Sequence, residues 1–283
     1  MLLCVDVGNT QIALGLYPEP GTDDPTGRPL VRTWRMRTDP RMTADELEVA
    51  FAGLLGPYAG QVTGVAALST VPTLLRELRL LIDRRGEPSV VVGPGVRTGV
   101  PLLVDNPREV GADRVMNTLA AHRLFGTACV VVDFGTSTNV DVVSAKGEFL
   151  GGALAPGIVI SMEALATRAA ALRTVELVRP RSVIGKNTVE SLQSGVLYGA
   201  VGQVDGLVRR MLAELGAKAG PVTVVGTGGL APLMSGLSET ITEFVPDLTL
   251  HGLRLTYVRN ARITSVTSGN SNSPAEVSGR VAR

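Results

Sequence analysis

Two segments of the chain repeat one local design, and this repeat limits the folds that the chain can adopt. The segments are residues 2–10 (LLCVDVGNT) and 129–138 (CVVVDFGTST). Each reads as a short apolar strand that ends in Asp-x-Gly and a polar, hydroxyl-bearing turn, and each leads into a second apolar stretch, at 12–16 or 140–143. Such a unit predicts a strand, a tight turn and a returning strand. Two copies with matching flanks predict a duplicated α/β fold with a nucleotide between its halves.

The residue types in the two turns suit phosphate chemistry. Gly8 and Gly135 let the backbone bend and approach a ligand closely. Exposed N–H groups and hydroxyls in such turns bind phosphate oxygens, and Asp6 and Asp133 can hold a cation against them. A single Asp-x-Gly after a buried strand is most often only a turn. The second copy is what favours a site that clamps a polyphosphate.

Composition narrows the class of protein. The chain has 283 residues, of which 45% are apolar and 19% charged, so it can bury the cores of two ordinary domains. A net charge of +1 gives no general attraction to nucleic acid or to an anionic membrane. Cys4 and Cys129 stand in apolar strand patterns and read as core residues of a reducing compartment. Without a signal peptide or a long apolar run, we expect a soluble, cytoplasmic protein.

Strand and helix patterns alternate along the chain, as in α/β proteins. Residues 43–46 read as a capping box that opens a helix, and 115–124 as a helix that links the halves. Residues 154–172 are small and apolar almost all round, which predicts a helix buried in the core or against a partner subunit. The expected domains are 1–117 and 118–259, and the polar tail 260–283 is expected to be disordered.

A third stretch, residues 106–114, precedes the linking helix. Asp113 lies near the predicted helix N-terminus, where the dipole favours the ionised carboxylate that can accept a proton from a substrate hydroxyl. Arg114 can bind a substrate carboxylate through two hydrogen bonds. From spacing alone, a capping Asp beside a solvated Arg explains the same residues.

The fourth and fifth stretches are rich in glycine. Gly185-Lys186 is not a Walker A motif, because Pro180 stands where the first Gly must be. Thr188 then reads either as a helix cap or as a substrate contact. Residues 222–229 form a strand that enters a glycine turn, against which a nucleotide's base and ribose can lie.

Together these stretches resemble the type III pantothenate kinases, a family of the acetate kinase/sugar kinase/Hsc70/actin superfamily. The resemblance covers about residues 1–259, with DVGNT at 6–10, GADR at 111–114, DFGT at 133–136 and GKNT at 185–188 in register. It implies an α/β fold of two duplicated actin-like (ribonuclease H-like) domains with a nucleotide cleft between them. The implied activity is ATP-dependent phosphorylation of pantothenate to 4'-phosphopantothenate, the first step of coenzyme A biosynthesis.

The resemblance also implies roles for single residues. Asp113 is the expected base, Asp133 the expected ligand of a monovalent cation (K⁺ or NH₄⁺), and Asp6 the expected partner of Mg²⁺ through ATP. The expected ATP contacts are Asp6, Val7, Gly8, Asn9, Thr10, Gln11, Ile12, Ala13, Gly135, Thr136, Gly228 and Gly229. The expected pantothenate contacts are Val104, Gly111, Ala112, Asp113, Arg114 and Thr188. Members are usually homodimers, with substrate pockets near the dimer interface.

Two positions depart from the family pattern. Val104 stands where the family often has a substrate-contacting Tyr, and Asn139 stands where a hydroxyl residue is usual. Two alternatives stay open: a non-catalytic regulatory protein on the same scaffold, and a kinase of another small alcohol. The presence of Asp6, Asp113 and Asp133 together favours an active enzyme, whereas Val104 keeps the second alternative open.

Overall fold

The fold contains two five-stranded sheets with the same strand order. The computed structural model describes residues 1–18, 30–169 and 174–269, and side chains up to 261. In the first sheet the order is β3-β2-β1-β4-β5. Its strands are β1 (Leu2–Val7), β2 (Gln11–Tyr17), β3 (Arg32–Arg37), β4 (Gly64–Ser69) and β5 (Ser89–Val91). The first three are antiparallel neighbours, and β4 and β5 continue the sheet parallel to β1.

The second sheet repeats this plan with the order β10-β9-β6-β7-β8. Its strands are β6 (Ala128–Phe134), β7 (Ser137–Val143), β8 (Phe149–Pro156), β9 (Val222–Thr227) and β10 (Glu243–Phe244). Again three strands are antiparallel neighbours and two continue in parallel. Strand β6 therefore corresponds to β1, and the duplicated α/β fold predicted from the repeat is confirmed.

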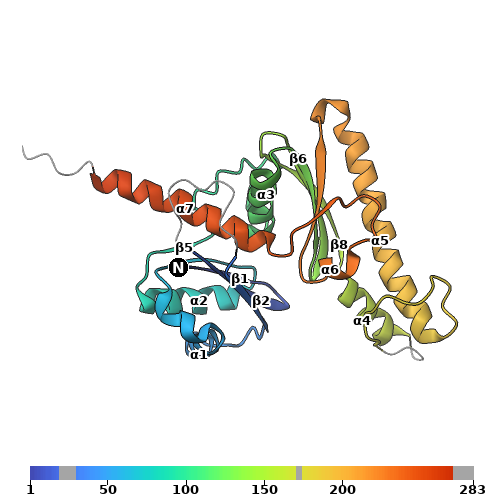
Figure 1. Ribbon diagram of the computed structural model, residues 1–283, viewed down its shortest axis with the longest axis horizontal. Helices are drawn as coiled ribbons and strands as arrows, with labels where there is room; N and C mark the ends of the chain where they lie inside the picture. Colours follow the sequence, from blue (N-terminus) through green and yellow to red (C-terminus); the bar gives the residue numbers. More distant parts are fainter. Residues whose placement is uncertain (19–29, 170–173, 270–283) are drawn as a thin grey trace, which may run out of the picture.

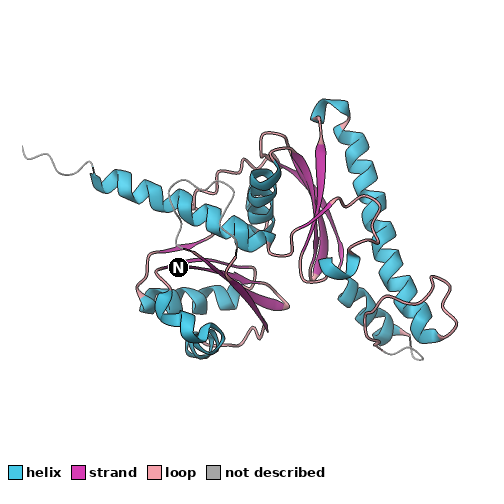
Figure 2. Cartoon of the chain, viewed as in Figure 1, coloured by secondary structure: helices cyan, strands magenta, loops and turns pink. Residues whose placement is uncertain are grey.

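Helices separate and flank the two sheets (Figures 1 and 2). Helices α3 and α7 pack against each other between the sheets, and α7 also lies on β1 and β4. On the outer faces, α1 and α2 cover the first sheet, and α4 and α5 the second. The helices are α1 (Ala44–Leu55), α2 (Pro72–Arg85), α3 (Ala112–Phe125), α4 (Ile158–Arg168), α5 (Thr188–Leu215), α6 (Ala231–Met234) and α7 (Leu248–Gly269). Short 3₁₀ turns occupy Gly56–Gln61, Pro107–Glu109 and Ala217–Ala219.

Local sequence accounts for the helices on the first sheet. The Thr43 side chain accepts from the Glu46 amide while the Glu46 carboxylate accepts from the Thr43 amide, so the predicted capping box opens α1. Leu74, Leu78 and Leu81 recur at helical spacing in α2 and are buried against the sheet. Within the described residues, no helix is long and apolar enough to cross a membrane.

The helix predicted over 154–172 is wrong at its start. Residues 154–156 complete β8, and α4 begins only at Ile158. The break falls at Gly157, where a Cβ would lie 2.2 Å from the Thr136 carbonyl oxygen, so the chain packs too closely there for any side chain. Most apolar residues of α4 are exposed in the single chain, Val159 and Leu165 among them, so burial in the chain's own core is wrong, and burial against a partner subunit stays a prediction. Residues 170–173 lie outside the described part.

The C-terminal segment differs from the expectation for 260–283. Helix α7 continues past 260 to Gly269, and residues 270–283 lie outside the described residues. By packing, α7 joins the first half, because Leu250 and Leu253 share a buried cluster with Leu2 and Cys4 of β1. Helix α7 thus returns the chain to its first sheet. The domain boundaries at 117 and 259 stay a prediction.

Candidate active site

The two Asp-x-Gly turns meet between the two sheets. The hydroxyl oxygens of Thr10 and Thr136 lie 2.7 Å apart and share a hydrogen bond. Each turn is closed by its own backbone: the Gly8 amide donates to Gln11 O at 3.0 Å, and the Gly135 amide donates to Ser137 O at 3.0 Å. The structure thus brings the two predicted phosphate loops into direct contact.

The glycine turn after β9 joins the same place. Gly228 has φ +92°, and a Cβ on it would lie 2.4 Å from Asp133 Oδ1, so only glycine fits beside this carboxylate. A Cβ on Gly229 would lie 3.5 Å from Gln11 Oε1, which brings the first hairpin close to this turn. Three separate loops therefore meet at one place, and their role as an ATP site stays a prediction.

Some of the residues predicted to contact ATP have side chains that point away from the place where the loops meet. Val7 and Ile12 are fully buried in the core of the first sheet. Ala13 is half-buried and stands opposite Asp6 in the β1–β2 pairing. In contrast, Asn9, Thr10 and Gln11 are exposed in the turn. In this arrangement Val7 and Ile12 can meet a nucleotide only through their backbone.

Three half-buried acidic side chains, Asp6, Asp113 and Asp133, lie near the two turns. Asp6 and Asp133 stand at equivalent places in β1 and β6, opposite Ala13 and Asn139. The pKa of Asp6 is raised to about 8, mainly by burial and also by the charges of Asp113 and Asp133, while Arg35 opposes the rise. Burial likewise raises the pKa of Asp133 to about 7, with Asp113 adding to the rise. Such a concentration of negative charge favours bound cations.

Asp113 lies in the first turn of α3, as predicted. Its Oδ1 accepts from the Arg114 amide at 2.9 Å. Burial raises the pKa of Asp113, while that amide bond and the Arg114 charge lower it. Gly111 is the N-cap residue, and a Cβ there would lie 2.4 Å from Asp113 Oδ1, so glycine leaves room for the carboxylate. The capping alternative is wrong, because the capping position belongs to Gly111.

The capping alternative also required a solvated Arg114, but this side chain is paired within the protein. Its Nε donates to both carboxylate oxygens of Asp141 at 3.0 and 3.1 Å, and its Nη2 donates to Oδ1. The guanidinium carbon also lies 5.1 Å from the centre of the Phe149 ring. Burial raises the pKa of Asp141 and Arg114 opposes the rise. The two-bond recognition expected for a substrate carboxylate is made here by Asp141 of β7.

Two predicted pantothenate contacts lie far apart within one chain. Val104 is half-buried beside α3 and Phe149, and its Cγ1 would lie 3.8 Å from a Cβ on Gly151. Thr188 is exposed at the start of α5, well away from α3 (Figure 1). Thr188 is not the helix cap, because the Asn187 side chain accepts from the Glu190 amide at 2.9 Å.

Sequence reasoning missed two polar residues that hold the predicted site. Asp141 interrupts the apolar run 140–143, and a lone acid in such a run was the available signal. Asn117 is buried in α3, and its Nδ2 donates to Asp133 Oδ2 at 3.0 Å. An amide at 117 follows Asp113 by one helical turn, which places both on the same face.

Comparison with solved structures defines the class of protein. The activator of 2-hydroxyisocaproyl-CoA dehydratase from Clostridium difficile, with bound ADPNP, has a TM-score of 0.55 at 13% identity, over 97% of this chain and 99% of that one. The ethanolamine utilization protein EutJ from Carboxydothermus hydrogenoformans has a TM-score of 0.51 at 16% identity, over 90% and 88%. At such low identity these likenesses show the fold alone, which is the duplicated actin-like fold.

Sequence comparison narrows this class to one family. A family model for type III pantothenate kinase matches residues 2–210. The type III pantothenate kinase of Saccharopolyspora erythraea is 69% identical over 265 residues, which cover 92% of this chain and 99% of that protein. The corresponding protein of Rhodococcus opacus is 63% identical over 263 residues, with 92% and 96% covered. This chain belongs to the type III pantothenate kinase family.

Proposed function

We propose that this chain transfers the γ-phosphate of ATP to the hydroxyl of pantothenate, with Asp113 as the base, and so begins coenzyme A biosynthesis. One observation carries the assignment of roles. Asp113 raises the pKa of both Asp6 and Asp133, and these carboxylates end the two strands whose turns meet where Thr10 bonds to Thr136. Family membership supplies the substrate class.

Phosphoryl transfer is accelerated mainly by alignment and by charge neutralisation. The turns at Gly8 and Gly135 offer backbone N–H groups and the Thr10 and Thr136 hydroxyls to the phosphates. Asp113 accepts the proton of the attacking hydroxyl. It needs no strongly raised pKa for this step, because the proton can leave late in a loose transition state.

The acids at the cleft fit bound cations. Mg²⁺ is typically held by one or two carboxylates together with substrate phosphates, and bound Mg²⁺ neutralises phosphate charge. Among the described residues, no group of three or more His, Cys, Asp and Glu side chains can hold a metal ion by itself. We assign Asp6 to the Mg²⁺ that accompanies ATP and Asp133 to a monovalent cation, K⁺ or NH₄⁺. Burial raises the pKa of both carboxylates, and a bound cation would offset this cost of ionisation, which supports the assignment.

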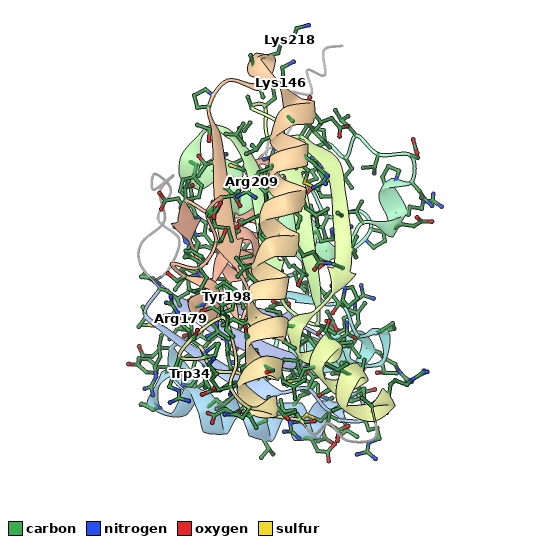
Figure 3. All side chains as sticks on the ribbon, turned by 90° about the vertical axis from the view of Figure 1, so that its right-hand side faces the viewer. Trp34, Lys146, Arg179, Tyr198, Arg209 and Lys218 are labelled. Carbon is green, nitrogen blue, oxygen red and sulfur yellow. The ribbon has the colours of Figure 1, made fainter. Side chains whose placement is uncertain are left out.

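A homodimer explains the separation of the predicted pantothenate contacts. Helix α3, which begins beside Asp113, and helix α5, which begins at Thr188, flank opposite faces of the second sheet, so a second copy would bring the two helix starts to one substrate. The face formed by α4 and α5, toward the viewer in Figure 3, carries exposed apolar side chains and a pocket of about 400 Å³. The exposed apolar residues are Leu154, Val159, Ile160, Leu165 and Val189. Such a face fits a contact with a second copy.

A coupled assay with purified protein, ATP, Mg²⁺, K⁺ and pantothenate tests the proposal. Asp113→Asn keeps the shape of the side chain and removes the proton acceptor. A positioned base contributes about 10²–10⁴-fold, so turnover should fall by that order while the thermal unfolding midpoint is kept. The matched control is Asp105→Asn, an exposed acid ahead of α3, which should retain turnover. Wild-type turnover in Asp113→Asn assigns the base elsewhere. Phosphorylation of another alcohol but not of pantothenate refutes the substrate.

A further inference from the structure

Helix α3 holds a buried amide directly behind Asp133. Asn117 is 1% exposed and follows Asp113 by one helical turn. Its Nδ2 donates to Asp133 Oδ2 at 3.0 Å. Its Oδ1 accepts from the hydroxyl of Thr249, in the first turn of α7, at 2.8 Å. A chain of hydrogen bonds therefore runs from α7 through α3 to the carboxylate at the end of β6.

The donors and acceptors allow one orientation of this chain. An ionised carboxylate only accepts, so the amide nitrogen of Asn117 must face Asp133. The amide oxygen then faces Thr249, which donates. Thr249 is itself held in place, because Asp247 at the entry to α7 pairs with Arg35 of β3 at 2.7 Å. The Asn117 side chain is thus fixed from both ends.

The bond from Asn117 leaves the second oxygen of Asp133 on the side of the phosphate loops. A Cβ on Gly228 would lie 2.4 Å from Oδ1, and one on Gly135 would lie 3.7 Å from it. Oδ1 therefore lies beside two glycine turns, which place no side chain next to it, whereas Oδ2 accepts the hydrogen bond of Asn117. Loss of the Asn117 bond would free the carboxylate to rotate away from this orientation.

We propose that Asn117 is a positioning residue that, supported by Thr249, holds the Asp133 carboxylate with Oδ1 toward the monovalent cation. This inference rests on the proposed role of Asp133. Asn117 acts through the orientation of Asp133 and does not itself bind the substrate or the cation. Thr249 acts one step further back, through the orientation of Asn117.

The main test is Asn117→Leu, which keeps the branched shape of the side chain with somewhat larger end groups and removes both hydrogen bonds. A hydrogen bond to a charged group contributes enough for roughly a ten- to hundredfold effect. The K⁺ concentration for half-maximal activity should rise by that factor, while the KM for pantothenate stays within about twofold. Binding is read independently of turnover as the rise in thermal unfolding midpoint when K⁺ replaces Na⁺ without nucleotide. Asn117→Leu should need correspondingly more K⁺ for the same rise.

Two further variants separate positioning from general damage. Thr249→Val removes only the rear hydrogen bond, so it should raise the K⁺ requirement by about two- to tenfold. In the double variant it should add nothing to Asn117→Leu, because the two residues act through one chain. The control is Thr118→Val, a buried neighbour in α3 that bonds to the Arg114 carbonyl. It should leave the K⁺ response unchanged.

The outcomes distinguish this inference from the proposed function. If wild-type protein responds equally to Na⁺ and K⁺, the cation role of Asp133 is refuted and the role of Asn117 with it. If wild-type protein responds to K⁺ and Asn117→Leu responds identically, positioning alone is refuted. Additive effects of Asn117→Leu and Thr249→Val also refute it.

Discussion

Neutralising one acid of the cleft should stabilise the ligand-free protein while it disables the enzyme. Asp6 is the residue of choice, because burial and the charges of Asp113 and Asp133 all raise its pKa. Asp6→Asn keeps the size of the side chain and removes its charge. The same change takes away the carboxylate assigned to Mg²⁺, so activity should fall sharply.

The direction of the pH effect follows from proton linkage. The pKa of Asp6 rises from an ordinary 3.8 to about 8 on folding. Between these values the folded protein binds more protons than the unfolded chain, so the free energy of unfolding falls as pH rises from about 4 to about 8. Each pKa unit corresponds to 1.36 kcal/mol, so the loss by pH 7 is at most about 4 kcal/mol. Partial exposure of Asp6 reduces it to roughly 1–3 kcal/mol.

Thermal unfolding in Na⁺ buffer with a chelator and no nucleotide provides the assay. For a chain of this size, 1 kcal/mol shifts the midpoint by about 2–4 °C, so Asp6→Asn should unfold roughly 2–10 °C higher than wild type at pH 8. At pH 4.5 the gain should nearly vanish, because wild-type Asp6 is then protonated in the folded state. Asp105→Asn, an exposed acid, should show no such gain at either pH.

Two results would refute this reasoning. A variant no more stable than wild type at pH 8 would mean that Asp6 carries no electrostatic strain in the folded state. An equal gain at pH 4.5 and pH 8 would mean that the gain does not come from ionisation. Adding Mg²⁺ and ATP to wild type should narrow the difference, because bound cations offset the charge on the acids.

Three further predictions concern the cation, the substrate and the assembly. Wild-type turnover should be low in Na⁺-only buffer and restored by K⁺; equal rates in both would remove the monovalent site. Val104→Tyr should be tolerated or lower the KM for pantothenate by up to roughly tenfold, since one hydrogen bond contributes about 0.5–1.5 kcal/mol; a blocked pocket would indicate another alcohol. Light scattering should show a dimer that Ile160→Glu, on the exposed face of α4, converts to monomer; a monomeric wild type would contradict the shared substrate site.

The fold was predictable where the sequence repeats itself. Residues 2–10 and 129–138 predicted two equivalent strand–turn–strand units, and β1–β2 and β6–β7 are those units. Residues 154–172 were not predictable in the same way, because apolar composition does not distinguish a core helix from an exposed one. The boundary between β8 and α4 falls at Gly157, which packs against the backbone of Thr136, a residue distant in sequence.

The same distinction separates the predicted part of the site from the missed part. Asp6 and Asp133 end strands before a glycine turn, and Asp113 begins a helix, so local pattern was enough to select them. Asp141 and Asn117 gain their meaning from partners on other elements. No local pattern in one sequence specifies which buried polar residue will meet which partner.

These partners give α3 a role beyond carrying the base. Asp113 stands at its start, Arg114 binds Asp141 of β7, and Asn117 binds Asp133 of β6. The far side of α3 packs on α7, which is tied to the first sheet through the ion pair between Asp247 and Arg35. A displacement of α3 relative to the second sheet would therefore move the base and disturb the cation ligand together. For this reason buried α3 substitutions that shift the helix should lower turnover and K⁺ response in parallel, whereas Asn117→Leu should separate the K⁺ response from the KM for pantothenate.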